Sequence, residues 1–284
     1  MPVISIDAWR DAGTFVELAG RRMFFRREGS GPALLLVHGY PTSSWDWTPI
    51  WTQLTARYDV IALDMLGFGE SAKPRGHRYS IFEQADLQMA LLHKLGIERF
   101  HVLAHDYGVT VGQELLARNA PIDSIAFLNG GLFPETHRPR LIQRVLASPL
   151  GPLVATLSNE KMFAKSLIAV FAKPPSREEV HAFWLLASKN DGMRALAGLI
   201  RYMHERRANR ERWVGALVAA TLPLVVINGS LDPVSGAHMV ERLLELRPGT
   251  TVVRLLTVGH YPQVEAPAEV LAAYDAFRAV PIVV

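Results

Sequence analysis

The chain has 284 residues, of which 49% are hydrophobic, so it can bury one large core and form one or two domains. Its formal net charge of +3 is too small to indicate a nucleic-acid-binding protein, and we expect no nucleic-acid partner. The absence of cysteine excludes disulfides and cysteine-ligated metal sites. No 18-residue apolar stretch and no N-terminal signal pattern occurs, which predicts a cytoplasmic protein with no membrane partner.

The first half of the chain alternates predicted strands with predicted helices. Short apolar or alternating runs predict the strands, and apolar residues at helical spacing predict the helices. The strands are at residues 14–18, 21–26, 33–37, 58–63, 100–104 and 122–128, and the helices are at 43–57, 80–95 and 109–118. The first two strands are joined by Ala19-Gly20 as an antiparallel hairpin, and Ser80 with Glu83 predicts a capping box.

The pattern changes after Asn129 and resumes near residue 222. Residues 133–213 contain no predicted strand, two proline-rich breaks and several helical patterns, which indicates a helical insertion. Its last predicted helix, 199–213, carries five arginines that we interpret as a solvated face: Arg201, Arg206, Arg207, Arg210 and Arg212. Strands at 222–228 and 250–256 and helices at 235–246 and 266–279 follow. The chain therefore divides into an α/β core, 1–132 and 214–284, and a helical cap, 133–213, with a mostly parallel sheet covered by helices.

A sharp turn joins the strand at 100–104 to the helix at 109–118, with Asp106 at its centre. Such a turn strains the central residue and needs small neighbours, which Ala104 and Gly108 provide. This is the elbow otherwise written G-x-S-x-G, with aspartate in place of serine, and the chain contains no G-x-S-x-G. Asp106 is therefore a candidate nucleophile, with a helix N-cap as the alternative interpretation.

Other polar residues also follow predicted strands directly. They are 38–42, Asp64, His105, Asn129, Asp232 and His260. In open α/β sheets, functional groups gather at this edge, and Asp106, Asp232 and His260 have the chain order nucleophile, acid, histidine. Asp232 as a turn residue and His260 as a surface histidine are the alternatives. We interpret Asp64, His38 and His105 as loop braces, and the glycine-rich stretch 67–71 as a tight turn, because it fits neither phosphate-binding fingerprint.

These residue types predict a two-step hydrolysis. A carboxylate nucleophile such as Asp106 attacks a saturated carbon and forms an ester with the enzyme. His260 then serves as general base on water, and Asp232 holds the imidazole tautomer and stabilises the imidazolium. The backbone N–H groups of Tyr40 and Tyr107 are the candidate oxyanion donors.

Several motifs resemble the α/β-hydrolase superfamily, and within it the branch of epoxide hydrolases and haloalkane dehalogenases. They are HGYPTSSWDW at 38–47, DMLGFGESAKP at 64–74, AHDYGVTVGQEL at 104–115, LDPV at 231–234 and GHYPQVEAP at 259–267. NGGLFPETHRPRL at 129–141, KNDG at 189–192 and RRANRERWVGAL at 206–217 are similar to the mesoderm-specific transcript group. The resemblance implies an α/β-hydrolase fold with an eight-stranded sheet and a helical cap. It also implies Asp106 as nucleophile, His260 as base and Asp232 as acid.

The two activities of this branch need different groups around the leaving atom. For a haloalkane dehalogenase, the resemblance implies that the leaving halide is bound by a tryptophan directly after the nucleophile and by an asparagine or a cap tryptophan. Here Tyr107 and Tyr40 stand in those places, and only Trp184 favours a dehalogenase. For an epoxide hydrolase, the resemblance implies cap tyrosines that act as ring-opening acids. Tyr202 is the only tyrosine in the predicted cap, with His181 or His204 as the candidate second donor.

We therefore expect an epoxide hydrolase that acts on a small hydrophobic epoxide, with Tyr202 as catalytic acid and no metal or cofactor. A haloalkane dehalogenase and a non-catalytic ligand-binding protein are the alternatives. We expect His38, Pro41 and Trp184 to contact substrate and the protein to be a monomer or homodimer. Seven apolar cap residues suggest either a hydrophobic substrate cavity or, equally well, packing between the cap and the core: Phe163, Leu167, Phe171, Phe183, Trp184, Leu185 and Leu199.

Overall fold

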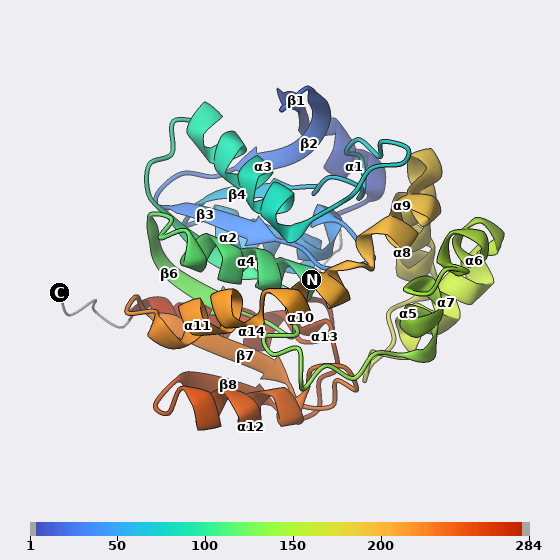
Figure 1. Ribbon diagram of the computed structural model, residues 1–284. Helices are drawn as coiled ribbons and strands as arrows, with labels where there is room; N and C mark the ends of the chain where they lie inside the picture. Colours follow the sequence, from blue (N-terminus) through green and yellow to red (C-terminus); the bar gives the residue numbers. More distant parts are fainter. Residues whose placement is uncertain (1–3, 280–284) are drawn as a thin grey trace.

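A single eight-stranded sheet forms the centre of the computed structural model, which describes residues 4–279 (Figure 1). The strands are β1 Thr14–Leu18, β2 Arg21–Glu28, β3 Ala33–Val37, β4 Asp59–Leu63, β5 Phe100–Ala104, β6 Ile122–Phe127, β7 Leu224–Gly229 and β8 Thr251–Leu255. They lie in the order β1-β2-β4-β3-β5-β6-β7-β8, in which β1 and β2 are antiparallel to their neighbours and the other pairs are parallel. The predicted mostly parallel sheet is confirmed.

Helices cover both faces of the sheet because its central strands are apolar on both sides. On one face α3 Ile81–Lys94, α4 Tyr107–Ala117 and α11 Arg210–Ala219 pack together, and α2 Thr48–Thr55 packs against α14 Pro267–Ala279 on the other (Figure 1). The helix α12 Ala237–Leu246 connects β7 to β8, and the short α13 Pro262–Glu265 precedes α14. No helix within residues 4–279 has the length and apolar content that a bilayer crossing requires.

Six helices lie between Asn129 and α11, beyond the carboxyl end of β6 (Figure 1). They are α5 Leu141–Leu146, α6 Gly151–Leu157, α7 Glu160–Ile168, α8 Arg177–Ser188, α9 Gly192–Leu199 and α10 Tyr202–Ala208, with the 3-10 turn η2 Lys189–Asp191 between α8 and α9. We call α5 to α10 the cap. The parallel strands β5, β6 and β7 end beneath the cap, so the loops that follow these strands lie against it.

The predicted helix 199–213 is wrong, because the chain breaks twice in this stretch. α9 ends at Leu199, α10 begins at Tyr202, and Asn209 separates α10 from α11 with φ −111° and ψ 22°. α11 packs on α4 of the core, where Glu114 accepts hydrogen bonds from Trp213 Nε1 and Arg212 Nε, both at 2.7 Å. The predicted cap boundary at residue 213 therefore falls inside a helix that lies on the core.

Three local predictions also differ from the structure. The helix α1 Ile6–Asp11, which the sequence pattern did not indicate, buries Trp9 edge-on against Trp51 at 4.7 Å. The helix predicted at 43–57 begins as the 3-10 turn η1 Ser44–Trp47. Only half of the capping box forms, since Ser80 Oγ accepts from Glu83 N at 3.1 Å while the Glu83 carboxylate pairs with His77 instead.

Candidate active site

Asp106 occupies the strained elbow between β5 and α4, with φ 48° and ψ −109°. Its backbone N–H donates to Asn129 O at 2.7 Å, and its side chain makes no capping bond to α4. A Cβ atom at Gly108 would clash with Val37 O, so only glycine lets the helix start this close to β3. Asp106 is the N-cap residue of α4 by position, but its carboxylate makes no capping bond and its backbone is strained, so a purely capping role does not account for it.

The structure brings Asp106, Asp232 and His260 together, and all three are buried. His260 Nδ1 lies 2.7 Å from Asp232 Oδ2, and His260 Nε2 lies 3.2 Å from Asp106 Oδ2. The imidazole thus bridges two carboxylates that come from the ends of different strands. This geometry is that of a nucleophile, a base and an acid that orients the base.

Asp232 is fixed by a ring of donors. Its Oδ1 accepts from Val234 N at 2.7 Å, and its Oδ2 accepts from Ser235 Oγ at 2.7 Å and from Asn129 Nδ2 at 2.9 Å. Asn129 was noted only as a polar residue after a strand, and the structure shows that its amide connects β6 to the Asp232 loop. These bonds fix the carboxylate that faces His260.

The buried charges shift one another's protonation. Burial disfavours the imidazolium of His260, but the Asp232 and Asp106 carboxylates outweigh burial and raise the pKa of His260 to about 10. Burial opposes ionisation of Asp106, yet its hydrogen bond to His260 and the nearby charge lower the pKa of Asp106 to about 2. The pKa of Asp232 is lowered for the same reason, against the effect of burial. At neutral pH the site therefore holds two carboxylates around one imidazolium.

The predicted oxyanion donors lie next to Asp106. Tyr40 N donates to Asp106 Oδ1 at 2.8 Å. Tyr107 is the first residue of α4, so its N–H lies at the helix end that has no intrahelical acceptor. One carboxylate oxygen of Asp106 thus accepts from the backbone N–H of Tyr40, and the other faces His260.

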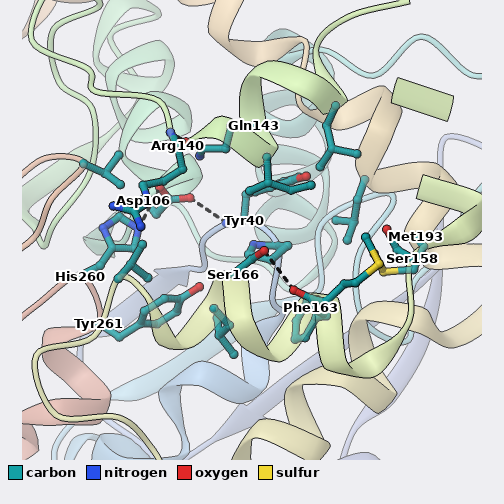
Figure 2. Close-up of a pocket in the computed structure, with 18 residues that line it drawn as sticks. Tyr40, Asp106, Arg140, Gln143, Ser158, Phe163, Ser166, Met193, His260 and Tyr261 are labelled. Carbon is teal, nitrogen blue, oxygen red and sulfur yellow. Dashed lines mark hydrogen bonds and ion pairs between the residues drawn. The ribbon is translucent and has the colours of Figure 1, made fainter. Parts of the chain in front are cut away.

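A cavity opens above Asp106 and His260, between the core and the cap (Figure 2). Seven of its lining side chains are apolar cap residues: Ile142, Leu146, Met162, Phe163, Leu167, Met193 and Leu196. The polar ones from the cap side are Arg140, Gln143, Ser158 and Ser166, and the core side adds Tyr40, Pro41, Val234 and Tyr261, with Val170 from the segment after α7. The lining suits a small hydrophobic molecule whose reacting end meets the carboxylate.

Not every residue expected at the substrate site lines this cavity. Pro41 does, but His38 is fully buried below it, where Nδ1 bonds to Gly39 O and Nε2 accepts from Met65 N. Trp184 lies behind Phe163, with ring centroids 5.6 Å apart. We correct the substrate-contact assignment of both, since His38 serves as a loop brace and Trp184 as a packing partner. Among the other expected cavity residues, Phe163 and Leu167 line it, whereas Leu185 is exposed.

The predicted ring-opening acid, Tyr202, is buried but is not among the cavity-lining residues. Its ring lies 5.1 Å from that of Tyr107 and 6.2 Å from that of Tyr40, so it supports the side chains around the nucleophile. His181 is exposed and paired with Glu160 at 2.8 Å, and His204 also lies outside the cavity. No predicted cap donor therefore lines the cavity in the described structure.

Two residues near the site were not anticipated. Tyr261, which follows His260 directly in sequence, lines the cavity, and this adjacency was the signal that could have identified it. Arg206 is 3% exposed rather than solvated, and its guanidinium donates to Gly131 O. Nothing in the local pattern distinguishes Arg206 from the exposed arginines around it. Within residues 4–279, no group of three or more His, Asp or Glu side chains is arranged to hold a metal ion.

Comparisons with known proteins identify the family of the chain. Residues 32–267 match the family described as alpha/beta hydrolase fold. The chain is 42% identical to the human mesoderm-specific transcript homolog protein, over 96% of this chain and 88% of that protein. It is also 42% identical to the putative hydrolase LipZ of Mycobacterium tuberculosis, over 93% of this chain and 94% of that protein.

Among solved structures, haloalkane dehalogenase DbeA from Bradyrhizobium elkani superposes with a TM-score of 0.80 at 25% identity, over 94% of this chain and 98% of that one. The family match spans most of the core and all of the cap, and it includes the elbow and both other residues of the candidate triad. The chain belongs to the α/β-hydrolase fold family.

Proposed function

We propose that this hydrolase opens epoxides to vicinal diols through an ester formed at Asp106. The observation that carries the proposal is the position of Asp106, a buried carboxylate on a strained elbow that faces an apolar cavity together with His260 and two phenols. The reaction needs no metal or cofactor, because the carboxylate, the imidazole and water supply every atom that is transferred. The substrate that fits this lining is a small hydrophobic epoxide.

The contacts of Asp106 assign different tasks to its two oxygens. Oδ1 accepts from Tyr40 N at 2.8 Å, whereas Oδ2 lies 3.2 Å from His260 Nε2. Oδ2 attacks an epoxide carbon, whose bond to the ring oxygen breaks, and Oδ1 becomes the carbonyl oxygen of the ester. Because its pKa is lowered to about 2, Asp106 is ionised and ready to attack at neutral pH.

Ester formation prepares the second step. It removes the negative charge of Asp106, which is one of the two charges that raise the pKa of His260. His260 can then give up its proton toward the oxygen of the opened ring. Once neutral, it takes a proton from a water molecule that attacks the ester carbonyl, while Asp232 stabilises the new imidazolium. The backbone N–H groups of Tyr40 and Tyr107 receive the oxyanion.

A haloalkane dehalogenase is the second candidate, and the similarity to DbeA favours it. A departing halide needs N–H donors beside the reacting carbon. The described residues that line the cavity include no tryptophan and no asparagine, and the N–H donors they do include, Arg140 and Gln143, belong to the cap side rather than to the loops around Asp106. They do include the phenols of Tyr40 and Tyr261, which are groups that protonate oxygen. A non-catalytic binding protein would have no need of the strained elbow and the three joined residues, so we place it third.

Mass spectrometry of a trapped intermediate tests the proposal. The variant His260→Gln lacks the base for ester hydrolysis and should accumulate the ester when incubated with an aryl epoxide. A mass increase equal to the whole epoxide, absent in His260→Gln/Asp106→Asn, supports the epoxide hydrolase. An increase equal to an alkyl group after incubation with a bromoalkane, without an epoxide adduct, would establish the dehalogenase. No adduct with either reagent would favour the binding protein.

A further inference from the structure

Ring opening leaves a charge on the epoxide oxygen, and a proton donor must meet it there. The cap tyrosine expected for this task, Tyr202, is not among the residues that line the cavity. Tyr261 lines it beside Asp106 and His260, and Figure 2 shows its hydroxyl directed from the loop after β8 into the cavity. The phenols among the cavity-lining residues, Tyr40 and Tyr261, therefore both come from the core.

The hydroxyl of Tyr261 is buried without a hydrogen bond of good geometry among the described residues, in a side chain that is 1% exposed. Buried hydroxyls in folded proteins are normally paired, so an orphan that faces a substrate cavity indicates a ligand that completes it. Burial and the nearby Asp46 and Asp106 carboxyl groups raise the pKa of Tyr261 well above its ordinary value. The phenol therefore keeps its proton until a substrate oxygen takes it.

The ring of Tyr261 is held rigidly, so its hydroxyl has a fixed place relative to the nucleophile. Phe171 stacks on it with centroids 4.7 Å apart and planes 4° from parallel, and His105 packs on it at 4.8 Å. Its backbone N–H donates to Glu265 Oε1 at 3.2 Å, which ties the loop to α13. Such restraint favours a group that must meet one substrate atom, because little orientational entropy remains to be lost in the transition state.

Two buried polar groups continue from Tyr261 into the core. The Thr42 hydroxyl lies close enough to the phenol to oppose the rise of the Tyr261 pKa. The same hydroxyl donates a short hydrogen bond to the carboxyl group of Asp46, which is buried on η1. Thr42 and Asp46 thus hold the phenol from the core side.

We propose that Tyr261, a residue of the core, is the catalytic acid that protonates the oxygen of the opening epoxide ring, and that Thr42 and Asp46 are its positioning residues. This inference rests on the proposed epoxide hydrolase function. The assignment replaces Tyr202 and makes the cap a source of shape rather than of acid.

The step balances as follows. The lone pair of Asp106 Oδ2 forms the new bond to carbon, the broken ring bond leaves its electrons on oxygen, and that oxygen takes the Tyr261 proton. Loss of the Asp106 charge then lets the His260 imidazolium return a proton to the phenolate, which restores Tyr261 and leaves His260 neutral. His260 takes a proton from the water that attacks the ester and passes it to the departing alkoxide, the regenerated Asp106 carboxyl group gives its proton to His260, and the product is a diol.

The test measures ester formation separately from ester hydrolysis. His260→Gln and His260→Gln/Tyr261→Phe are incubated with an aryl epoxide, and the rate of adduct formation is followed by intact-protein mass spectrometry. Loss of the acid should slow this rate about 100-fold or more. His260→Gln/Tyr274→Phe removes another buried phenol whose hydroxyl has no hydrogen bond among the described residues, but which lies outside the cavity lining. It is the matched control and should change the rate less than about twofold.

Each outcome decides between the two proposals. No adduct in His260→Gln itself would overturn both the proposed function and the role of Tyr261. Adduct formation at an equal rate with and without the Tyr261 hydroxyl, or equal slowing in the Tyr274 control, would overturn the role of Tyr261 and leave the function intact.

A second measurement separates acid catalysis from packing. In the background with His260 intact, Tyr261→Phe should slow ring opening in single-turnover experiments but leave hydrolysis of the ester unchanged. Thr42→Val should slow ring opening by a smaller factor, about 10-fold, and add nothing further to Tyr261→Phe. Slowing of both chemical steps by Tyr261→Phe would show a structural role and would also contradict the inference.

Discussion

The two sides of the cavity are built on different physical principles. The core side carries Asp106, His260 and Tyr261 on loops at strand ends, where hydrogen bonds and ring contacts fix each side chain. The cap side presents mainly apolar side chains from α5, α7 and α9, and its four polar lining residues form no ion pair within residues 4–279. We therefore infer that the core side determines the reaction, whereas the cap side determines which molecules reach it.

Removal of the nucleophile is the most severe way to test the core side. Asp106→Asn keeps the size of the side chain but removes its charge and its nucleophilic oxygen, so diol formation should fall by at least about 10⁴-fold. Initial rates with an aryl epoxide check this, with active-site purity verified by mass because slow deamidation restores aspartate.

The matched control for this variant is Asp86→Asn. Asp86 pairs with Arg118 on the surface and its side chain is 66% exposed, so the rate should stay within about twofold. Near-normal turnover by Asp106→Asn would place the nucleophile elsewhere and remove the basis of the comparison.

The charges of the core side should also appear in the pH dependence of stability. The pKa of His260 is raised to about 10 in the folded protein, above its value of about 6.5 in an unfolded chain. Its stabilising contribution is therefore complete below about pH 6.5 and is lost as the pH rises through about 10. The melting temperature should fall across this window, and this part of the fall should be missing in His260→Gln.

His93→Gln serves as the control, because His93 is exposed on α3 and far along the chain from either carboxylate of the site. Its melting curve should run parallel to that of the wild type from pH 7 to pH 10. If the melting temperature of His260→Gln also fell in parallel with that of the wild type over this pH range, the imidazole would not be held between two charged carboxylates.

Two buried arginines extend the comparison to stability. Arg26 in the core is 4% exposed, pairs with Glu28 at 2.6 Å and donates to Trp9 O at 3.2 Å. Arg206 in the cap is 3% exposed, has no carboxylate partner within residues 4–279, and burial lowers its pKa. Nearby His137, whose pKa burial and Arg206 lower to about 3, offers no opposite charge. The core pairs its buried cation and the cap does not.

Replacement by methionine should therefore affect the two sites unequally. Arg26→Met leaves Glu28 without its cation and should reduce the free energy of unfolding by about 2 kcal/mol, a value discounted because Glu28 is half-exposed. Arg206→Met removes a desolvated charge and should cost less than about 1 kcal/mol. Urea denaturation measures both, and a larger loss at Arg206 would show that its bond to Gly131 O and its contact with Tyr202 outweigh desolvation.

The features that the sequence revealed are those whose causes are local. The elbow around Asp106 needs only a strand, a helix and two small residues in adjacent positions, and His260 and Asp232 each follow a strand in the expected chain order. The parallel sheet follows from the alternation of apolar runs with helical patterns. Each of these could be inferred without knowledge of distant neighbours.

The features that escaped prediction depend on distant contacts. Arg206 has the same neighbours in sequence as exposed arginines, and only the approach of Gly131 and Tyr202 buries it. α11 packs on the core rather than in the cap because Glu114 of α4 accepts hydrogen bonds from Arg212 and Trp213. Tyr202 and Trp184 were assigned to the cavity from their place in the cap, but the cap helices turn these side chains against aromatic neighbours.

The smallest predicted effect concerns the cap side, where shape alone should matter. Met162 lines the cavity from α7 but is 42% exposed, so Met162→Ala removes substrate contact with little loss of packing in the folded protein. For a bulky epoxide KM should rise about threefold to fivefold while kcat stays within about twofold, because the lost contact is equal in the ground state and the transition state. For a small epoxide that does not reach α7, neither constant should change. Leu150→Ala, an exposed cap substitution outside the cavity lining, should leave both substrates unaffected. A fall in kcat with unchanged KM for Met162→Ala would mean that the cap takes part in the chemical step, which would contradict the division between the two sides.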